Sequence, residues 1–352
     1  MIAELFAAAL PLAAALAYSS YKARSFEQAY PNIGELKDVG GFRMNALHVP
    51  ASPDADLPAL VFIHGASGNL RDQAGAFREQ LEGKAELLFV DRPGHGYSER
   101  GGPENALPSG QADTIARLMD AHRIKRAIIV GHSFGGAIAA AFGVRHPEKT
   151  AGLVFLAPAT HPWEGGIDWY YHVATVPLLG WLFNRVFVVP LGLRRVELGT
   201  LNIFHPNPRP KDYVATTGPE LALRPGTFRS NAAELARFRD YLGVNAPLYR
   251  NIKSPAIIIT GDSDRIVWEH LHSRGLARDI PGAQLIAVKG LGHKPDYVAT
   301  DLAIAAMESI AGRPRDLQAI ARAVEERIAL LRVDREDQTV GTVPPSMVYS
   351  AP

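Results

Sequence analysis

Short apolar runs recur along the chain, and most of them are stopped by glycine. Residues 33–49 are expected to form two short strands around a glycine turn. Later runs have the character of buried strands, and they span residues 59–65, 85–94, 126–133, 151–159, 255–262 and 283–290. Helical periodicity fills the gaps between them at residues 73–83, 110–124, 136–148 and 268–280. Short, wholly apolar strands that alternate with helices predict an α/β fold with a mostly parallel central sheet, flanked by helices on both faces.

The alternation is interrupted once, between the strand that ends near Ala159 and the strand that begins at Pro255. This stretch is rich in aromatic residues and proline and contains no strand-like run. An insertion of that length is more typical of a helical subdomain than of a loop, so we expect a helical cap after the sixth strand. The predicted organisation is a core of residues 33–159 and 251–312, a cap of residues 160–250, a C-terminal helix at 313–333 and a disordered tail at 334–352.

The N-terminal segment, residues 1–24, differs from the rest of the chain. A long apolar and uncharged stretch in it is followed by Lys22 and Arg24. We expect residues 1–18 to attach the protein to a membrane, with the positive charges keeping the globular part cytoplasmic. The stretch is short for a bilayer-spanning helix, and residues 15–17 read Ala-Leu-Ala, so a cleaved signal peptide and export stay open. A buried or dimerising helix would need no membrane.

Composition and charge exclude several classes of protein. The chain has 352 residues, of which 47% are hydrophobic and 21% are charged, as in ordinary globular proteins. The net charge of +1 provides no basic field that would attract nucleic acid. The chain has no cysteine, which excludes disulfides, thiolate nucleophiles and cysteine-based metal sites. The oligomeric state stays open.

The segment Gly-His-Ser-Phe-Gly, residues 131–135, places Ser133 between an apolar strand and an alanine-rich helix. A sharp turn from strand to helix strains the serine backbone, and side chains two residues to either side would collide, so the two glycines fit such a turn. The N-terminus of the following helix also favours negative charge near the serine. The pattern predicts that Ser133 is a nucleophile rather than part of a structural turn.

A serine hydroxyl needs a base, and the base needs a third group that orients it. Candidates for both groups lie in later loops of the chain. His293 follows the last predicted strand in a glycine-containing loop, so it is the candidate base. We expect Asp264 to orient it. Asp262 is the alternative, although a residue directly after a glycine more often makes turn contacts.

The early strand at 59–65 ends in a loop that begins with His64 and Gly65, where a backbone N–H can face the serine. The expected donors of an oxyanion hole are the N–H groups of Ala66 and of Phe134, the residue after the nucleophile. We expect His64 and Gly65 to support this loop. His64 orders it through side-chain hydrogen bonds rather than by transferring protons.

Other kinds of site have weaker signals. No metal site is expected, because His270 and His272 do not have the i, i+4 spacing that puts two ligands on one helix face. The chain has no P-loop or dinucleotide fingerprint, and no cofactor is implied. The predicted cap contains an aromatic cluster for which three roles stay open. It packs as the core of the lid, lines an acyl pocket or contacts a membrane. Its members are Trp169, Tyr170, Tyr171, Trp181, Phe183 and Phe187.

Taken together, these motifs resemble the α/β-hydrolase superfamily over about residues 33–312. They are HG-x-x-G at 64–68, DRPGHGYS at 91–98, the serine turn at 131–135, G-x-x-D at 261–264 and G-x-G-H at 290–293. Within the superfamily, the chain looks like the capped group of carboxylesterases, C–C bond hydrolases, epoxide hydrolases and haloalkane dehalogenases. The last two use an aspartate where this chain has Ser133, which disfavours their reactions. The resemblance also implies fold-stabilising roles for Asp91 and His95.

The sequence therefore predicts a carboxylesterase-like serine hydrolase with the triad Ser133, His293 and Asp264. The expected substrate is a lipophilic small molecule with an ester or acyl bond, selected by the cap. Two alternatives keep the same triad: a C–C hydrolase of ring-fission products and a perhydrolase. A non-catalytic receptor or scaffold on the same fold is the rival from another class, and the complete triad argues against it.

Overall fold

A computed structural model of the chain describes residues 2–336, and the side chains discussed below are those of residues 10–331. One sheet of eight strands forms the centre, in the order β1-β2-β4-β3-β5-β6-β7-β8. Only the pairings of β2 with β1 and β4 are antiparallel. The strands are β1 (Glu35–Asp38), β2 (Arg43–Val49), β3 (Ala59–Ile63), β4 (Leu87–Val90), β5 (Ala127–His132), β6 (Thr150–Leu156), β7 (Ala256–Gly261) and β8 (Gln284–Val288).

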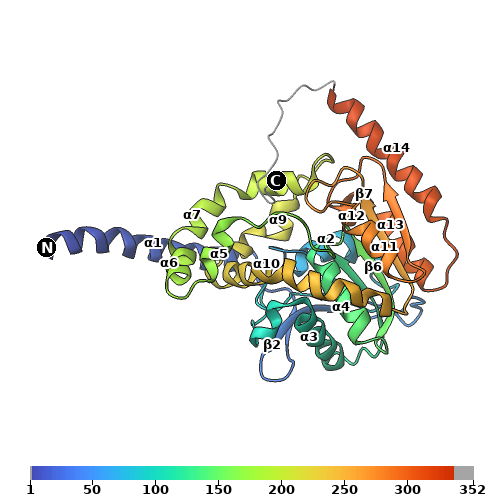
Figure 1. The fold of residues 1–352 in the computed structure, drawn as a ribbon, viewed down its shortest axis with the longest axis horizontal. Coiled ribbons are helices and arrows are strands. Elements are labelled where there is room, and N and C mark those ends of the chain that lie inside the picture. Colours follow the sequence, from blue (N-terminus) through green and yellow to red (C-terminus); the bar gives the residue numbers. More distant parts are fainter. Residues whose placement is uncertain (1, 337–352) are drawn as a thin grey trace.

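The central strands are apolar on both sides because helices cover both faces of the sheet (Figure 1). In β3, Val61 and Ile63 pack into one core cluster, with side chains of the helices α3, α4 and α11. Their neighbours Leu60 and Phe62 pack into the other cluster, with α2, α13 and α14. These helices are α2 (Leu70–Leu81), α3 (Pro108–Ala121), α4 (Phe134–Arg145), α11 (Ser273–Asp279), α13 (Thr300–Ile310) and α14 (Leu317–Glu336). The predicted alternation of strands and helices is confirmed.

Some helices begin at other residues than the periodicity suggests. The helix expected at 73–83 begins at Leu70, because the Asn69 side chain caps it by accepting the Arg71 N–H at 2.9 Å. The helix expected from residue 268 begins only at Ser273, after a turn.

Between β6 and β7, which are neighbours in the sheet, the chain forms a helical insertion, so the expected cap after the sixth strand is present. It contains α5 (Trp169–Thr175), α6 (Leu179–Val186), α7 (Val188–Leu193), α8 (Val196–Phe204), α9 (Tyr213–Thr217), the 3₁₀ helix η2 (Pro219–Leu223), α10 (Pro225–Asn245) and the 3₁₀ helix η3 (Ala246–Asn251). Figure 1 shows α5, α6 and α7 at one end of the molecule, with α10 running from them across the core.

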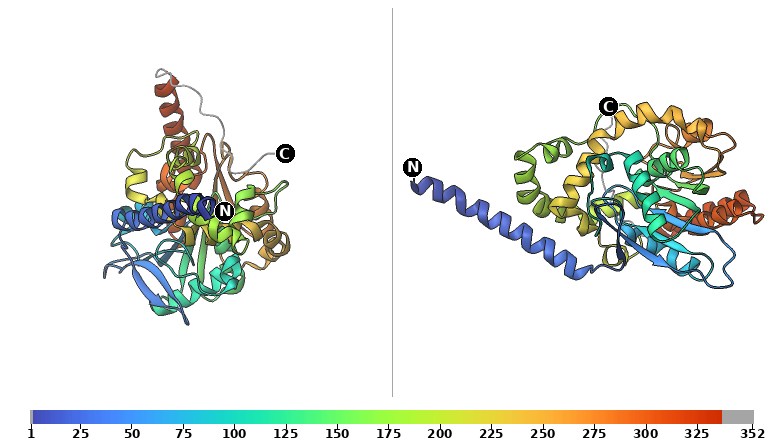
Figure 2. Two further views of the ribbon diagram at one scale, coloured as in Figure 1. Left: turned by 90° about the vertical axis from the view of Figure 1, so that its left-hand side faces the viewer. Right: turned by 90° about the horizontal axis from the view of Figure 1, so that it is seen from below.

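The chain begins with a long helix, α1 (Ile2–Ala29), which extends away from the body (Figures 1 and 2). Its last turns pack against α6, α7 and η2 of the cap, where Phe26 is buried with Val189 and Leu221. Within residues 2–336, no helix has both the length and the apolar character needed to cross a bilayer. At the other terminus, α14 continues through Glu336, past the expected start of the tail at 334. The rest of that predicted tail, residues 337–352, lies outside the described residues.

Candidate active site

Ser133 occupies the turn between β5 and α4, with φ 53° and ψ −119°. A non-glycine residue with such a positive φ is strained, and this strain lifts the serine out of both elements. The turn leaves no room for side chains beside it. A Cβ on Gly131 would lie 2.4 Å from the Gly135 carbonyl oxygen, and one on Gly135 would lie 2.3 Å from the Ile63 oxygen. Glycine is therefore required on both sides of Ser133, as the sequence pattern predicts.

His293 and Asp264, 29 positions apart in the chain, meet at the carboxyl edge of the sheet. The His293 Nδ1 and the Asp264 Oδ2 are 2.7 Å apart, and both residues are buried. The other carboxylate oxygen of Asp264 accepts the N–H groups of Ile266 and Val267, at 2.8 and 2.9 Å. Because Nδ1–H donates to the carboxylate, the lone pair of the imidazole is on Nε2, where a general base needs it.

Asp262 has different partners. Its Oδ1 accepts the Gly290 N–H at 2.6 Å and the Ser263 hydroxyl at 2.9 Å, so it joins the turn after β7 to the loop after β8. This geometry favours Asp264 over Asp262 as the partner of the histidine.

The loop after β3 lies directly against the serine. A Cβ on Gly65 would come within 3.1 Å of the Ser133 Cβ, so only glycine allows the loop to approach this closely. Phe134 is the first residue of α4, and the first N–H groups of a helix have no intrahelical acceptor. Among the described residues, neither the Ala66 nor the Phe134 N–H binds a backbone or side-chain acceptor, so both remain available to an oxyanion.

His64 is fully buried and anchors this loop at both ring nitrogens. Its Nδ1–H donates to the Gly65 carbonyl at 2.8 Å, and its Nε2 accepts the Arg92 backbone N–H at 3.1 Å. Burial and then the neighbouring Arg92 charge lower the pKa of His64 well below its ordinary value. A neutral imidazole with both nitrogens engaged fits the expected loop-ordering role.

Residues 91–98, expected to form a structural turn, make contacts that fit this role. The buried carboxylate of Asp91 accepts the N–H groups of Leu70 and Tyr97, at 2.7 and 2.8 Å, and the Asn45 side-chain amide at 2.8 Å. His95 is buried beside the Arg92 guanidinium, at 3.1 Å. The Asp91 carboxylate therefore joins this turn to β2 and to the start of α2.

His132, the residue before Ser133, supports the loop of His293. Its Nε2 is 2.8 Å from the His293 carbonyl oxygen, and since a carbonyl only accepts, the Nε2 must carry the proton. The two rings lie 5.0 Å apart, centroid to centroid. Burial, then the charges of Lys294 and His293, lower the pKa of His132 well below its ordinary value, so the ring stays neutral.

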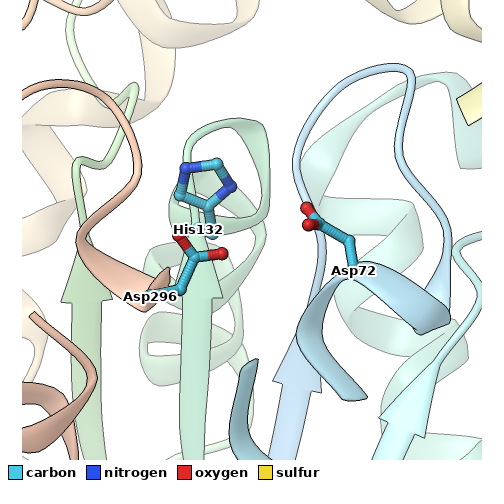
Figure 3. Close-up of side chains that lie close together, drawn as sticks. All are labelled: Asp72, His132 and Asp296. Atoms are coloured by element: carbon cyan, nitrogen blue, oxygen red, sulfur yellow. The ribbon is translucent and has the colours of Figure 1, made fainter. Parts of the chain in front are cut away.

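A buried cluster of charges lies beside His132 (Figure 3). Ligand atoms of Asp72, His132 and Asp296 fall within 4.8 Å of one another, a spacing that would suit a metal ion. However, the Lys294 ammonium is bound to Asp72 Oδ2 and Asp296 Oδ2, each at 2.8 Å, and supplies the cation for both carboxylates. Burial lowers the pKa of Lys294, but the charges of Asp296 and Asp72 outweigh this and raise it above its ordinary value.

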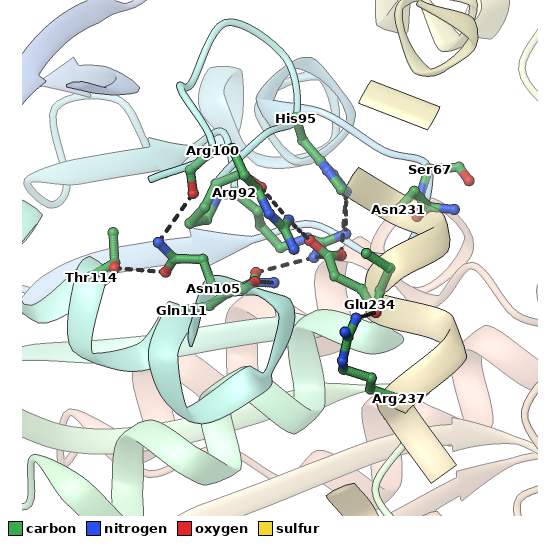
Figure 4. A network of polar contacts seen from close by, with 12 residues as sticks. Ser67, Arg92, His95, Arg100, Asn105, Gln111, Thr114, Asn231, Glu234 and Arg237 are labelled. Carbon is green, nitrogen blue, oxygen red and sulfur yellow. Dashed lines mark hydrogen bonds and ion pairs between the residues drawn. The ribbon is translucent and has the colours of Figure 1, made fainter. Parts of the chain in front are cut away.

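Two side chains of α10, one helical turn apart, bind to the loop after β3 and to its neighbour Arg92. The Asn231 Oδ1 accepts the Ser67 N–H at 2.9 Å. Glu234 binds the guanidinium of the fully buried Arg92 at 2.6 Å, and Arg92 in turn donates to the Gly65 carbonyl at 3.1 Å and lies over the Phe134 ring (Figure 4). The cap is therefore tied to the loop that carries one expected oxyanion donor and to the residue that carries the other.

The cap is also tied to the loop of the candidate base. The Asn207 side chain, between α8 and α9, donates to the Gly290 carbonyl at 2.9 Å and accepts the Gly292 N–H at 2.7 Å. A Cβ on Gly292 would lie 2.3 Å from the His205 carbonyl oxygen, so the loop and the cap are in close contact.

The sequence pattern does not single out these supporting residues. His132 falls on the variable position of the serine turn, and Asn207 and Asn231 lie in the segment with the weakest periodicity. The one signal is that Asn231 and Glu234 are polar residues three positions apart on a helix, which places them on one face.

Comparisons with known proteins identify the family of the chain. Residues 58–189 match the family model of the alpha/beta hydrolase fold. The chain is 31% identical to 2-hydroxymuconate semialdehyde hydrolase of Pseudomonas putida over 278 residues, 76% of this chain and 89% of that protein. It is 26% identical to Lipase 1 of Psychrobacter immobilis over 243 residues, 69% of this chain and 73% of the lipase.

Among solved structures, the esterase RhEst1 from Rhodococcus sp. ECU1013 superposes with a TM-score of 0.60 at 21% identity, covering 80% of this chain and all of the esterase. The serine turn, the fold and the likeness to the 2-hydroxymuconate semialdehyde hydrolase agree with one another. This protein is a member of the α/β-hydrolase family, and it is a hydrolase.

Proposed function

We propose that the protein is a serine hydrolase that cleaves an ester or a related acyl bond of a lipophilic small molecule. The observation that carries the proposal is the 2.7 Å hydrogen bond between His293 and Asp264 at the same sheet edge as the strained Ser133. A buried histidine held by a carboxylate near a serine on a strained turn is the arrangement that activates a serine hydroxyl.

In the proposed reaction, the Ser133 Oγ attacks the carbonyl carbon while His293 Nε2 takes the hydroxyl proton. The Ala66 and Phe134 N–H groups hold the negative oxygen of the tetrahedral intermediate, and the N-terminus of α4 adds a favourable field. The intermediate collapses, the imidazolium gives its proton to the leaving alcohol, and an acyl-serine remains. Water, deprotonated by His293, then releases the acid and restores the serine. Asp264 keeps the imidazole in the required tautomer and stabilises its charged form.

The lipophilic character of the substrate is inferred from the cap. The α10 residue Phe238 packs on Phe134 with ring centroids 4.3 Å apart, and Trp163 packs on Phe238 at 5.9 Å. Aromatic side chains therefore border the residue that follows the nucleophile. We expect medium-chain acyl esters to be hydrolysed with a higher kcat/KM than short polar esters.

A fluorophosphonate probe tests the nucleophile. Wild type should be labelled and Ser133→Ala should not, because the probe reacts with activated serines. Hydrolysis of p-nitrophenyl esters of increasing chain length then tests the substrate class, with Ser133→Ala as the blank. Absence of labelling in the folded wild type would overturn the proposal in favour of a non-catalytic receptor or scaffold.

A second candidate function is hydrolysis of a C–C bond, and the 31% identity to 2-hydroxymuconate semialdehyde hydrolase favours it. The same serine, histidine and acid would be used. Direct competition decides between the two: both an ester series and 2-hydroxymuconate semialdehyde are offered to one preparation. A kcat/KM at least a hundredfold higher on the second substrate would assign the protein to C–C bond hydrolysis.

A further inference from the structure

The end of the cap that carries α6 and α7 exposes large apolar side chains in one short segment. We call them the apolar tip: Val176, Leu178, Leu179, Trp181, Phe187 and Leu191. Leu178 is 85% exposed, Leu179 55% and Trp181 46%, far above the values usual for such residues. Large apolar residues gathered in this way on a soluble surface mark a site of interaction.

The backbone at the tip is strained so as to present a leucine to solvent. Leu178 has φ 60° and ψ −59°, and the Leu179 N–H donates to the Pro177 carbonyl across it at 2.6 Å. This is a γ-turn of the rare, unfavourable hand, here with a side chain at its centre. Packing within the protein does not compensate for the strain, because Leu178 is almost fully exposed.

Within residues 169–196 the charged side chains are of one sign, and Asp168 and Glu197 flank this stretch. Between Trp169 and Val196 the chain has three arginines and no aspartate or glutamate. The Arg185 guanidinium lies 4.5 Å from the centre of the Trp181 ring, while Arg194 and Arg195 are exposed at the end of α7. The tip is therefore apolar in its middle and basic at its border, which complements a surface that is anionic outside and apolar beneath.

Helix α1 leaves the molecule from the same end. Its last turns pack on α6 and α7, and the rest extends beyond the cap (Figures 1 and 2). Leu10 and Leu12 are exposed on it, and Lys22 and Arg24 follow nearer the cap. The apolar and basic residues of α1 therefore belong to the same end of the protein as the apolar tip.

We propose that the apolar tip docks on the surface of an anionic phospholipid bilayer. Its leucines and aromatic rings enter the headgroup region, and its arginines meet the lipid phosphates. A second copy of the chain fits this surface less well. A two-fold contact of the tip with itself would bring its three arginines toward those of the second copy. The proposal does not depend on which bond the enzyme cleaves.

The test is sedimentation of the full-length protein with vesicles. We expect strong binding to vesicles of phosphatidylcholine with phosphatidylglycerol, and weaker binding to phosphatidylcholine alone. Leu178→Glu/Leu179→Glu should lower the affinity for the anionic vesicles by about tenfold or more, because two apolar groups are replaced by charges that the lipid repels. Arg194→Gln/Arg195→Gln should remove most of the preference for the anionic lipid.

The matched control is Val244→Glu/Leu248→Glu, which places two charges on exposed apolar positions, one in the last turn of α10 and one in η3. It should bind as wild type does. Equal binding by the tip variant and this control would overturn the proposal, and so would a wild type that stays in the supernatant with both vesicles. A wild-type dimer without lipid that the tip substitutions dissociate would assign the tip to self-association instead. Thermal melting of each variant checks that it is folded.

Discussion

The Nε2–H of His132 donates a hydrogen bond to the carbonyl oxygen of His293, 2.8 Å away. The residue just before the candidate nucleophile thus holds the loop that carries the candidate base. The two candidate loops come from distant parts of the chain, and this bond joins them directly. Burial is the main cause that lowers the pKa of His132, so the ring brings no positive charge next to His293.

His132→Ala is expected to lower kcat by about tenfold or more with little change in KM, because a small displacement of the base misaligns proton transfer. Rates are normalised to the sites that react with fluorophosphonate, so that loss of folded protein does not count. His132→Gln, whose amide can reach the same carbonyl, should recover part of the loss. A rate per active site equal to wild type in the alanine variant would contradict the positioning role.

Asp264→Asn is expected to lower kcat by a factor on the order of 10³–10⁴, because an amide no longer selects the Nδ1–H tautomer of His293. The variant keeps one oxygen for the Ile266 and Val267 N–H groups, so its fold should persist. Asp262→Asn is the matched control, since its carboxylate contacts the Gly290 N–H. Similar losses of kcat in both variants would exclude the assignment of the acid to Asp264.

Glu234→Ala is expected to lower the free energy of unfolding by about 3–5 kcal/mol, because it leaves the fully buried Arg92 without its carboxylate. Urea unfolding followed by circular dichroism measures the change. Asp240→Ala, an exposed acid on the same helix, should change it by no more than about 0.5 kcal/mol. A cost below about 1 kcal/mol for Glu234→Ala would mean that water replaces the lost carboxylate.

Stability should fall as the pH drops below about 6.5. Burial, and then the nearby His161, lower the pKa of His272 to about 3. Its Nδ1 accepts the backbone N–H groups of Thr160 and His161, at 3.2 and 3.1 Å. Between pH 6.5 and 3, His272 is therefore protonated in the unfolded chain and neutral in the folded chain. The free energy of unfolding falls by up to about 1.4 kcal/mol for each pH unit in this range.

His272→Asn keeps an acceptor for these N–H groups but has no titratable ring. The slope of the free energy of unfolding against pH reports how many more protons the unfolded chain binds than the folded one. Near pH 5 this number should be lower by about one in the variant. An unchanged slope would show that His272 is protonated in the folded protein at that pH.

The sheet was predictable because its central strands are short and apolar on both faces, a pattern typical of a parallel sheet covered by helices. The residues of the candidate triad could be proposed because each lies in the segment after a strand, and parallel strands bring such segments to one edge. The contacts of Asn207 with Gly290 and of Asn231 with Ser67 could not be predicted from the sequence. They join residues 83 and 164 positions apart through side chains that the local pattern treats as ordinary loop or surface residues.

The two asparagine bridges have a consequence for protein engineering. Transplanting the cap of a relative onto this core, in order to change its substrate range, would cut both bridges unless the donor carries hydrogen-bonding side chains at the same two places. Such a chimera would have a new cap but would lose two contacts that hold the candidate catalytic loops. Randomising α5–α8 while retaining Asn207 and Asn231 avoids this penalty, so the outer cap helices are where new specificities can be selected without rebuilding the enzyme.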